Sequence, residues 1–315
     1  MRIVFWGTPE FATPPLRALL GEGFDVRGVI TQPDRPRGRS RSALEPSPVK
    51  RVALEEGIPV LQPERPRGDE FLSAFSAMQP DVSVVVAYGH ILPAAAIDLP
   101  RRGTLNIHAS LLPALRGAAP IQWAIAEGHA ETGITIIQMV PALDAGPMLH
   151  ALRTPVAPDE TGGELTQRLS ELGAQAIVEA LMLLDADAAR PIPQDEALAT
   201  YAPKLDRDTC RTDWLQPAAV VARRIRAFDP VPGAWSTMDG VDVKFFGVRV
   251  EGGGRAGRPG EVLAIDERGM VVACGEGEAG GAVRITSVVP AGRRRLGALD
   301  WHRGRGVSPG DVFGD

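Results

Sequence analysis

The sequence predicts an α/β protein in two parts, a Rossmann-like, mainly parallel sheet domain followed by a small, OB-like β-barrel. Three observations predict this. The first half alternates short apolar runs with helical patterns, which is typical of βα units in a parallel sheet. Residues 185–200 are polar and contain prolines. From about Lys204 onward, short β-branched segments separated by glycines dominate, which is typical of an antiparallel barrel.

The first half contains apolar runs short enough to be buried parallel strands. We expect strands at residues 2–7, 26–30, 60–61, 81–87, 103–108, 132–139 and 148–156. We expect helices at residues 10–20, 47–56, 120–128 and 161–184. Thr8 and Ser47 are suitable N-caps, and a proline follows each of them. In the last helix, leucines and alanines recur along one face, which predicts that this face is buried.

The second half has a different pattern. We expect one helix at residues 217–228 and strands at residues 241–250, 260–265, 270–273 and 283–289. The expected domains are therefore a catalytic domain at 1–184, a linker at 185–206 and a C-terminal β-barrel domain at 207–315.

Composition excludes several classes of protein. The 315 residues carry a net charge of −5, which excludes a uniformly basic nucleic-acid binder but not a local basic patch. Two cysteines are too few for a disulfide framework, and no run of about 20 apolar residues could span a membrane. We expect a soluble, cytoplasmic protein with neither a membrane partner nor an obligate protein partner. Asn106 is the only asparagine in the chain.

The best candidates for chemistry lie between residues 106 and 146. Asn106 and His108 end an expected strand, and alternation places them on the same face. Ligands of open α/β sheets bind at the carboxyl ends of strands. Asp144 follows in a loop beside Gly146. An amide, an imidazole and a carboxylate together can polarise a carbonyl, stabilise an oxyanion and move a proton. The plainer alternative is polar decoration of a strand end and an ordinary turn.

These residues stand in a longer motif, Asn-Ile-His-Ala-Ser-Leu-Leu-Pro at 106–113, followed by Arg-Gly-Ala-Ala-Pro-Ile-Gln at 116–122 and Leu-Asp-x-Gly at 143–146. The motif resembles the folate-dependent formyltransferases. The resemblance extends to Phe-Trp-Gly-Thr-Pro-Glu-Phe-Ala at 5–12, Gln-Pro-Asp-Arg-Pro at 32–36, Pro-Ser-Pro-Val-Lys at 46–50 and Tyr-Ala-Pro-Lys-Leu at 201–205. These further motifs narrow the resemblance to the members of the family that formylate methionyl-tRNA.

The resemblance implies residue roles. Asn106, His108 and Asp144 would be the catalytic residues. The reduced folate, 10-formyltetrahydrofolate as co-substrate, would lie against Tyr88, Gly89, Ser110, Leu111, Leu112 and Pro113. Initiator methionyl-tRNA would contact Arg35, Arg37, Arg39, Arg41 and Lys204. No metal is implied.

The sequence also departs from the family pattern, because Ala114-Leu115 stands where Arg-Trp is usual and Ala145-Gly146-Pro147 where Thr-Gly-Asp is usual. Two alternatives stay open beside tRNA formylation. One is a formyltransferase for a small amine, such as a glycinamide nucleotide or an amino sugar. The other is a tRNA-binding module without transferase activity. The arginine-rich loop and the second domain argue against the first, and the intact catalytic trio argues against the second.

Overall fold

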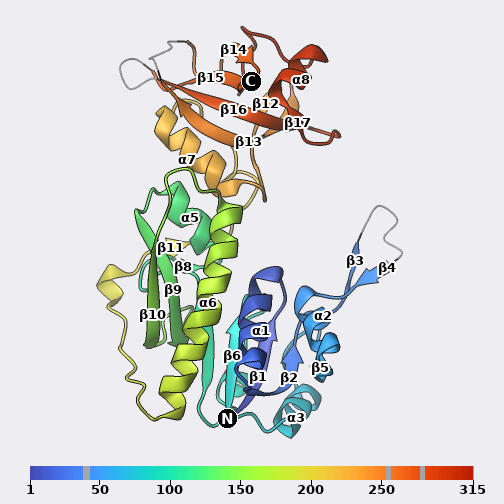
Figure 1. Ribbon diagram of the computed structural model, residues 1–315, viewed down its shortest axis with the longest axis vertical. Helices are drawn as coiled ribbons and strands as arrows, with labels where there is room; N and C mark the ends of the chain where they lie inside the picture. Colours follow the sequence, from blue (N-terminus) through green and yellow to red (C-terminus); the bar gives the residue numbers. More distant parts are fainter. Residues whose placement is uncertain (38–42, 253–256, 277–280, 315) are drawn as a thin grey trace. The chain divides into compact units, whose positions relative to one another are not determined.

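The computed structural model describes residues 1–37, 43–252, 257–276 and 281–314 (Figure 1). The chain forms two compact units. Unit 1 comprises Met1–Gly117, Thr132–Pro155 and Thr166–Ala202, and unit 2 comprises Ala118–Glu131, Val156–Leu165 and Pro203–Asp315. The chain therefore passes between the units more than once, so each unit combines segments that are distant in the sequence.

Unit 1 is built on a seven-stranded sheet with the order β10-β9-β7-β6-β1-β2-β5. Its strands are β1 (Arg2–Gly7), β2 (Asp25–Ile30), β5 (Val60–Leu61), β6 (Val82–Val86), β7 (Thr104–His108), β9 (Glu131–Gln138) and β10 (Met148–Pro155). The β7-β6-β1-β2-β5 part is parallel throughout, whereas β9 is antiparallel to β7. This confirms the expected mainly parallel sheet.

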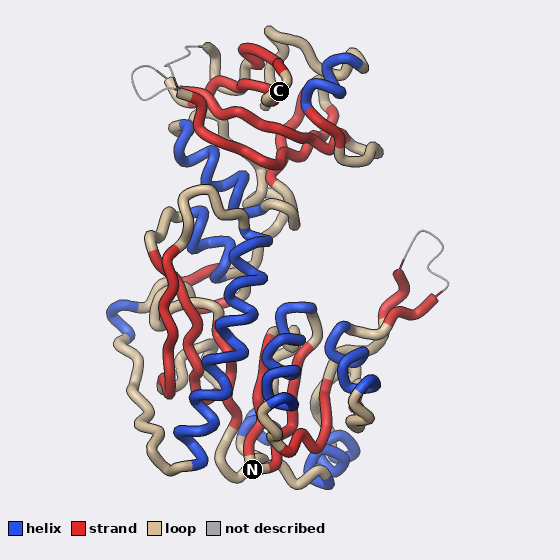
Figure 2. The backbone as a smooth tube through the Cα atoms, in the orientation of Figure 1, coloured by secondary structure: helices blue, strands red, loops and turns tan. Residues whose placement is uncertain are grey.

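From β1 to β7, the strands of this sheet alternate with helices along the chain, whereas β9 and β10 follow each other directly. Figure 2 shows the helices of the molecule in blue and its strands in red. The helices of unit 1 are η1 (Glu10–Ala12), α1 (Thr13–Gly21), α2 (Pro48–Glu55), α3 (Asp69–Ala77), α4 (Ala94–Ile97) and most of α6 (Gly162–Asp185). The side chain of Ser47 caps α2 by accepting a hydrogen bond from the backbone N–H of Lys50, as its sequence predicts. The prediction that Thr8 is an N-cap was wrong, because η1 begins after Pro9 without a side-chain cap and the Thr8 hydroxyl donates to the carbonyl of Tyr88 instead. Helices α3 and α4 were not expected.

Strands β1 and β6 run through the core of unit 1, where every residue of β6 and all of β1 after Arg2 are buried. Trp6 of β1 is fully buried and makes edge-to-face contacts with Phe71 and Phe75 of α3 and with Tyr88. Its indole N–H donates to the hydroxyl of Ser83 in β6, so the polar end of this ring is satisfied inside the core.

The segment expected to be a linker clusters with unit 1 as far as Ala202. It contains η2 (Glu196–Leu198) and β11 (Tyr201–Ala202), and β11 pairs in parallel with β8 (Arg116–Gly117). Ile192 also forms a bridge with Met148 at the start of β10. These contacts bring residues 185–202 to the residues that follow β7.

Unit 2 contains an antiparallel sheet with the order β12-β13-β16-β15-β14, and β17 pairs with β16. Its strands are β12 (Ala234–Met238), β13 (Val241–Glu251), β14 (Val262–Asp266), β15 (Gly269–Cys274), β16 (Gly281–Pro290) and β17 (Leu296–Gly297). Its helices are α5 (Pro120–Ala126), α7 (Ala218–Phe228) and α8 (Ala298–Arg303). This confirms the expected antiparallel C-terminal β domain, although β12, β17 and α8 were not expected.

The rings of Trp214, Phe245 and Phe313 pack together in the core of unit 2. Across the described ranges, no helix combines the length and apolarity needed to cross a membrane.

Candidate active site

Strand β7 carries two of the predicted catalytic residues into the middle of the sheet of unit 1. Asn106 lies between Val85 of β6 and Ile137 of β9, and His108 is at the carboxyl end of the strand. The His108 side chain is only 5% exposed. Asn106 is the one residue of β7 that is not fully buried. Among the residues that the structure describes, its side-chain amide has no hydrogen-bond partner. Asn106 thus offers a free N–H donor on the same strand face as His108.

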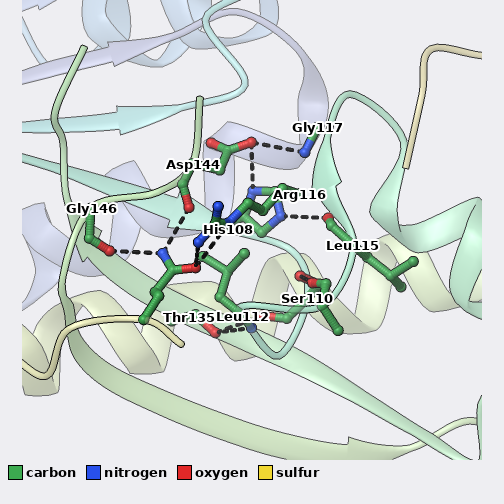
Figure 3. Close-up of polar contacts among 11 residues, drawn as sticks. His108, Ser110, Leu112, Leu115, Arg116, Gly117, Thr135, Asp144 and Gly146 are labelled. Carbon is green, nitrogen blue, oxygen red and sulfur yellow. Dashed lines mark hydrogen bonds and ion pairs between the residues drawn. The ribbon is translucent and has the colours of Figure 1, made fainter. Parts of the chain in front are cut away.

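The imidazole of His108 lies between two oxygens of the protein (Figure 3). Its Nε2 is 3.0 Å from the carbonyl oxygen of Leu115. Its Nδ1 is 3.7 Å from Oδ2 of Asp144, which is within ion-pair range but longer than a hydrogen bond. A substrate oxygen that accepts a proton or a hydrogen bond from this ring must therefore replace one of these two contacts.

The structure brings the carboxylate of Asp144 close to His108. The carboxylate is 14% exposed, and its Oδ2 also accepts a hydrogen bond of 2.9 Å from the backbone N–H of Gly117. Asp144 has a φ of 49°, a conformation that is uncommon for a residue other than glycine. Two residues later, a Cβ at Gly146 would lie 1.7 Å from the carbonyl oxygen of Gln138, so only glycine fits there.

Hydrogen bonds of the Ser110 and Thr135 hydroxyl groups hold the Ser-Leu-Leu-Pro turn at 110–113. The Ser110 hydroxyl donates to the carbonyl of Ala114 at 2.6 Å. The Thr135 hydroxyl donates to the carbonyl of Ser110 at 2.7 Å and accepts from the backbone N–H of Leu112 at 3.1 Å. Ser110 and Leu112 are buried, whereas Leu111 and Pro113 are half-buried. The two half-buried apolar side chains are the ones available to a ligand.

Tyr88 and Gly89 follow β6, the strand beside β7. The Tyr88 ring is buried in the core, and burial raises the pKa of its phenol to about 12. Its carbonyl accepts hydrogen bonds of 3.0 Å from the Thr8 hydroxyl and from Nε2 of Gln32. Gly89 has a φ of 87°, and a Cβ there would lie 2.4 Å from Nε2 of Gln32. The Tyr88 ring therefore packs in the core beneath this loop. Because Gly89 has no side chain, the backbone of the loop can lie close to the Gln32 side chain.

The expected arginine loop is a hairpin of β3 (Arg35–Arg37) and β4 (Ala43–Glu45). It stands apart from the main sheet in Figure 1. Arg35 is exposed and hydrogen-bonds Oε1 of Gln32. Arg39 and Arg41 lie outside the described residues.

The hairpin is anchored at its base. The ammonium group of Lys50 donates to Asp34 and to Gln62, both at 2.6 Å, and the amide of Gln62 donates to the other carboxylate oxygen of Asp34 at 2.7 Å. Lys50 and Gln62 hold the pKa of the Asp34 carboxyl below its usual range. Lys50 is thus a structural residue of the hairpin base.

The predicted tRNA-binding lysine, Lys204, belongs to unit 2 and is exposed. The preceding residue, Pro203, accepts a hydrogen bond of 2.9 Å from the indole N–H of Trp123 in α5. This contact fixes the backbone beside Lys204 and leaves its side chain in solvent.

Two residues close to Asp144 escaped the sequence prediction of the site. Arg116, quoted only as part of a motif, is 2% exposed and hydrogen-bonds Gln194 and Glu196. Gln194 in turn donates to the backbone around Asp144. No pattern in the polar stretch around Gln194 marks it, because its role depends on how the chain returns to unit 1. No cluster of metal-ligating side chains occurs within the described part of the chain.

Comparison with known proteins places this site in a family context. Residues 1–181 match the formyl transferase family, and residues 204–306 match the formyl transferase C-terminal domain family. The methionyl-tRNA formyltransferase of Pseudomonas paraeruginosa is 48% identical over 305 residues, covering 97% of this chain and 96% of that protein. The enzyme of the same name from Moorella thermoacetica is 45% identical, covering 100% of this chain and 99% of that protein.

Solved structures show the same fold at lower identity. HypX from Aquifex aeolicus in complex with tetrahydrofolic acid has a TM-score of 0.64 and 23% identity. The match covers 95% of this chain and 46% of HypX, so this chain spans about half of that protein. The methionyl-tRNA formyltransferase from Clostridium thermocellum has a TM-score of 0.58 and 13% identity, covering 80% of this chain and 94% of that one.

Proposed function

The chain belongs to the formyl transferase family and, within it, to the methionyl-tRNA formyltransferases, and on this basis we propose that it transfers a formyl group from 10-formyltetrahydrofolate to the α-amino group of methionine on initiator tRNA. The product would supply the initiation of translation. The observation that carries the mechanism is the amide of Asn106, which has no hydrogen-bond partner among the described residues. It shares a strand face with the buried His108, and His108 lies within ion-pair range of Asp144.

The reaction makes three demands on the protein. The α-amino group must be neutral to attack, and a free α-amino group has a pKa of about 7.7–8.0. The formyl oxygen gains negative charge as the nitrogen adds to the carbonyl carbon. A proton must leave the attacking nitrogen, and the departing nitrogen of the folate must gain one.

Asn106 meets the second demand. Its amide N–H groups have no partner among the described residues, so it can donate to the developing oxyanion without breaking a bond in the protein. An aspartate at this position, ionised at neutral pH, would have no N–H to donate.

His108 shares the stabilisation of the oxyanion with Asn106, and Asp144 serves the proton transfers. His108 can donate a ring N–H to the oxyanion when the substrate oxygen replaces the carbonyl of Leu115 at Nε2, now 3.0 Å away. Asp144 lies on the opposite side of the ring and is positioned to accept, directly or through a water, the proton lost by the attacking nitrogen. The same proton can then pass to the departing nitrogen of the folate, so that the transfer balances.

A reduced folate fits the surroundings of these residues. Its flat ring system needs an apolar surface and a few polar groups. Leu111 and Pro113 provide half-buried apolar side chains in a turn that is fixed by the hydrogen bonds of Ser110 and Thr135. Gly89, on the neighbouring strand end, presents backbone without a side chain.

The tRNA would be bound mainly through arginine. The hairpin that carries Arg35 and Arg37 is anchored at its base by Lys50 and continues into Arg39 and Arg41 in the sequence. A guanidinium group pairs with phosphate through two N–H groups and stacks on unpaired bases, so it suits the acceptor end of a tRNA. Lys204 in unit 2 would add a further phosphate contact. We place the reaction in the cytoplasm, where charged initiator tRNA is used.

One assay tests this function against its alternatives. The chain is incubated with 10-formyltetrahydrofolate and with methionyl-tRNA, a glycinamide nucleotide or an amino sugar as acceptor. We expect formylmethionyl-tRNA as the only formylated product, with tetrahydrofolate released in equal amount. Formylation of a small amine alone would instead establish the small-molecule alternative, and tRNA binding without any formylation would establish the binding module.

A further inference from the structure

A buried arginine beside the active site, Arg116, donates hydrogen bonds to two side chains from the segment after α6. Arg116 is 2% exposed. Its guanidinium donates to both carboxylate oxygens of Glu196 at 2.8 Å, and its Nε and one terminal nitrogen donate to Oε1 of Gln194 at 3.0 and 2.8 Å. A buried charge is tolerated only when it is paired in this way. The Glu196 carboxylate also raises the pKa of the Arg116 guanidinium, so the group stays charged.

The arginine fixes the orientation of the Gln194 amide. Arg116 has only N–H donors, so the atom of Gln194 that faces it must be the oxygen. The NH2 group of Gln194 then faces the opposite way, where it donates to the carbonyl oxygens of Asp144 and Gly146, both at 2.7 Å. The Gln194 oxygen thus accepts two hydrogen bonds and its NH2 group donates two. If the amide were flipped, its NH2 group would face the N–H donors of Arg116 and its oxygen would face the two carbonyl oxygens, so all four hydrogen bonds would be lost.

The loop that Gln194 holds carries a catalytic carboxylate in an uncommon backbone conformation. Asp144 has a φ of 49°. Its side chain is fixed by the Gly117 N–H and lies 3.7 Å from Nδ1 of His108. Because the carbonyl groups of Asp144 and Gly146 both bind one amide, the position of the Asp144 backbone depends on Gln194.

We propose that Gln194, oriented by Arg116, is a positioning residue that holds the Asp144–Gly146 loop and thereby places the Asp144 carboxylate against His108. It touches neither substrate nor the reacting atoms. This inference rests on the proposed function, because Asp144 matters only where the transferase reaction takes place.

The substitution Gln194→Glu tests the inference with almost no change in volume. In this variant one carboxylate oxygen still accepts from Arg116, but the second oxygen faces the carbonyl oxygens of Asp144 and Gly146. Both hydrogen bonds to the loop are then lost, and the carboxylate repels the two carbonyl oxygens. We expect kcat to fall about 10- to 100-fold, as for the loss of a supporting hydrogen bond near a catalytic group. We expect KM for methionyl-tRNA and for the folate to change less than about twofold, since the substrate contacts remain. The matched control is Gln167→Glu, at an exposed glutamine of α6, which we expect to behave as the wild type.

A double-mutant cycle separates positioning from a general structural role. If Gln194 acts through Asp144, Gln194→Glu adds less than about twofold to the loss of kcat in an Asp144→Asn background. Independent, multiplying losses would overturn the inference, as would a Gln194→Glu enzyme with normal kcat. If Gln194→Glu is too unstable to assay, Gln194→Asn serves in the same cycle, because it keeps the amide but is one methylene too short to reach both partners.

A readout without substrate keeps this test distinct from that of the proposed function. The ring signals of His108 in a ¹H–¹⁵N spectrum report the distance of the Asp144 carboxylate. We expect them to move in Gln194→Glu and to stay in place in Gln167→Glu. Unchanged signals refute the positioning role even if the wild type formylates tRNA, whereas a wild type that forms no formylmethionyl-tRNA refutes the proposed function instead.

Discussion

The carboxylate of Asp144 lies 3.7 Å from Nδ1 of His108 and accepts the backbone N–H of Gly117 with the same oxygen. One atom thus joins the loop after β9 to the strand end of β7 and to β8. Because this oxygen is the main link between the carboxylate and the imidazole, the two side chains are expected to act as one unit.

The first prediction concerns this pair. Asp144→Asn and His108→Ala are each expected to lower kcat by at least about 10²-fold, the usual contribution of a proton-transfer group. Because the two act as a unit, the double variant should be little worse than His108→Ala alone. Steady-state kinetics on methionyl-tRNA measures this. Losses that multiply in the double variant would show that the two residues act independently.

The second prediction concerns Asn106. The variant Asn106→Ala is expected to lower kcat by about 10²–10³-fold, as for the removal of one oxyanion donor. Its side chain makes no hydrogen bond to the described residues, so the melting temperature should stay close to that of the wild type. Kinetics and thermal unfolding on the same sample check both statements. A near-normal kcat would exclude Asn106 from oxyanion stabilisation.

Strand alternation was enough to predict where Asn106 and His108 lie. A period of two places these residues on one face, and a parallel strand ends at the edge where ligands bind. Asp144 could be proposed only together with the family motif, because a loop carries no periodicity that fixes its place in space.

The rest of the site depends on contacts between distant segments. Arg116 and Gln194 are 78 residues apart, and nothing local in the polar segment around Gln194 indicates that it returns to β8. Helix α3 was overlooked for a different reason. Only Phe71 and Phe75 of its nine residues are buried, with Leu72 half-buried beside them, and this short group does not repeat far enough along the sequence to define a helical period.

The third prediction concerns the arginine hairpin. Replacing Arg35 and Arg37 by alanine is expected to raise KM for methionyl-tRNA several-fold while leaving kcat at saturating tRNA nearly unchanged, since phosphate contacts supply binding energy. It should also flatten the loss of activity with increasing salt, because fewer counterions are released on binding. Steady-state kinetics at several salt concentrations provides the measurement.

The chain offers a matched control for the hairpin. Arg65 and Arg67 are exposed in a loop of unit 1 and form the same Arg-Pro-Arg sequence as Arg35 and Arg37. Their replacement by alanine removes the same charge from the same unit and is expected to leave KM within about twofold of the wild type. Equal effects of the two double variants would mean that net charge, and not the hairpin, governs tRNA binding.

The fourth prediction concerns the two thiols. Cys210 and Cys274 are buried in unit 2, and burial raises the pKa of Cys274 to about 12 and that of Cys210 above its usual value. Because the thiolate is the reactive form, neither cysteine should react with a thiol reagent in the native protein at pH 8, whereas both should react in denaturant. Rapid labelling of the native protein would contradict the burial of these side chains.

The last prediction concerns stability at acidic pH. Asp81 is 10% exposed and accepts hydrogen bonds from the side chain and backbone N–H of Arg2 and from Arg101. These donors, those of Arg2 foremost, hold the pKa of the Asp81 carboxyl well below its usual range. A carboxyl with a lowered pKa in the folded state stabilises the fold fully above the pKa of the unfolded chain, near 3.9, and this contribution is lost as the pH falls toward the folded value.

Asp81→Asn should therefore lower the free energy of unfolding by about 1.5–3 kcal/mol at pH 7, the range for hydrogen bonds to a charged group. The deficit relative to the wild type should shrink by about 1 kcal/mol between pH 6 and pH 3, because only the wild type loses an ionic contribution there. Urea denaturation across this range measures it, with Asp185→Asn as the control. Asp185 is an exposed carboxylate at the end of α6 in the same unit, where a surface charge contributes little. A deficit for Asp81→Asn that stays constant with pH would show that the carboxylate's charge is not what stabilises the fold.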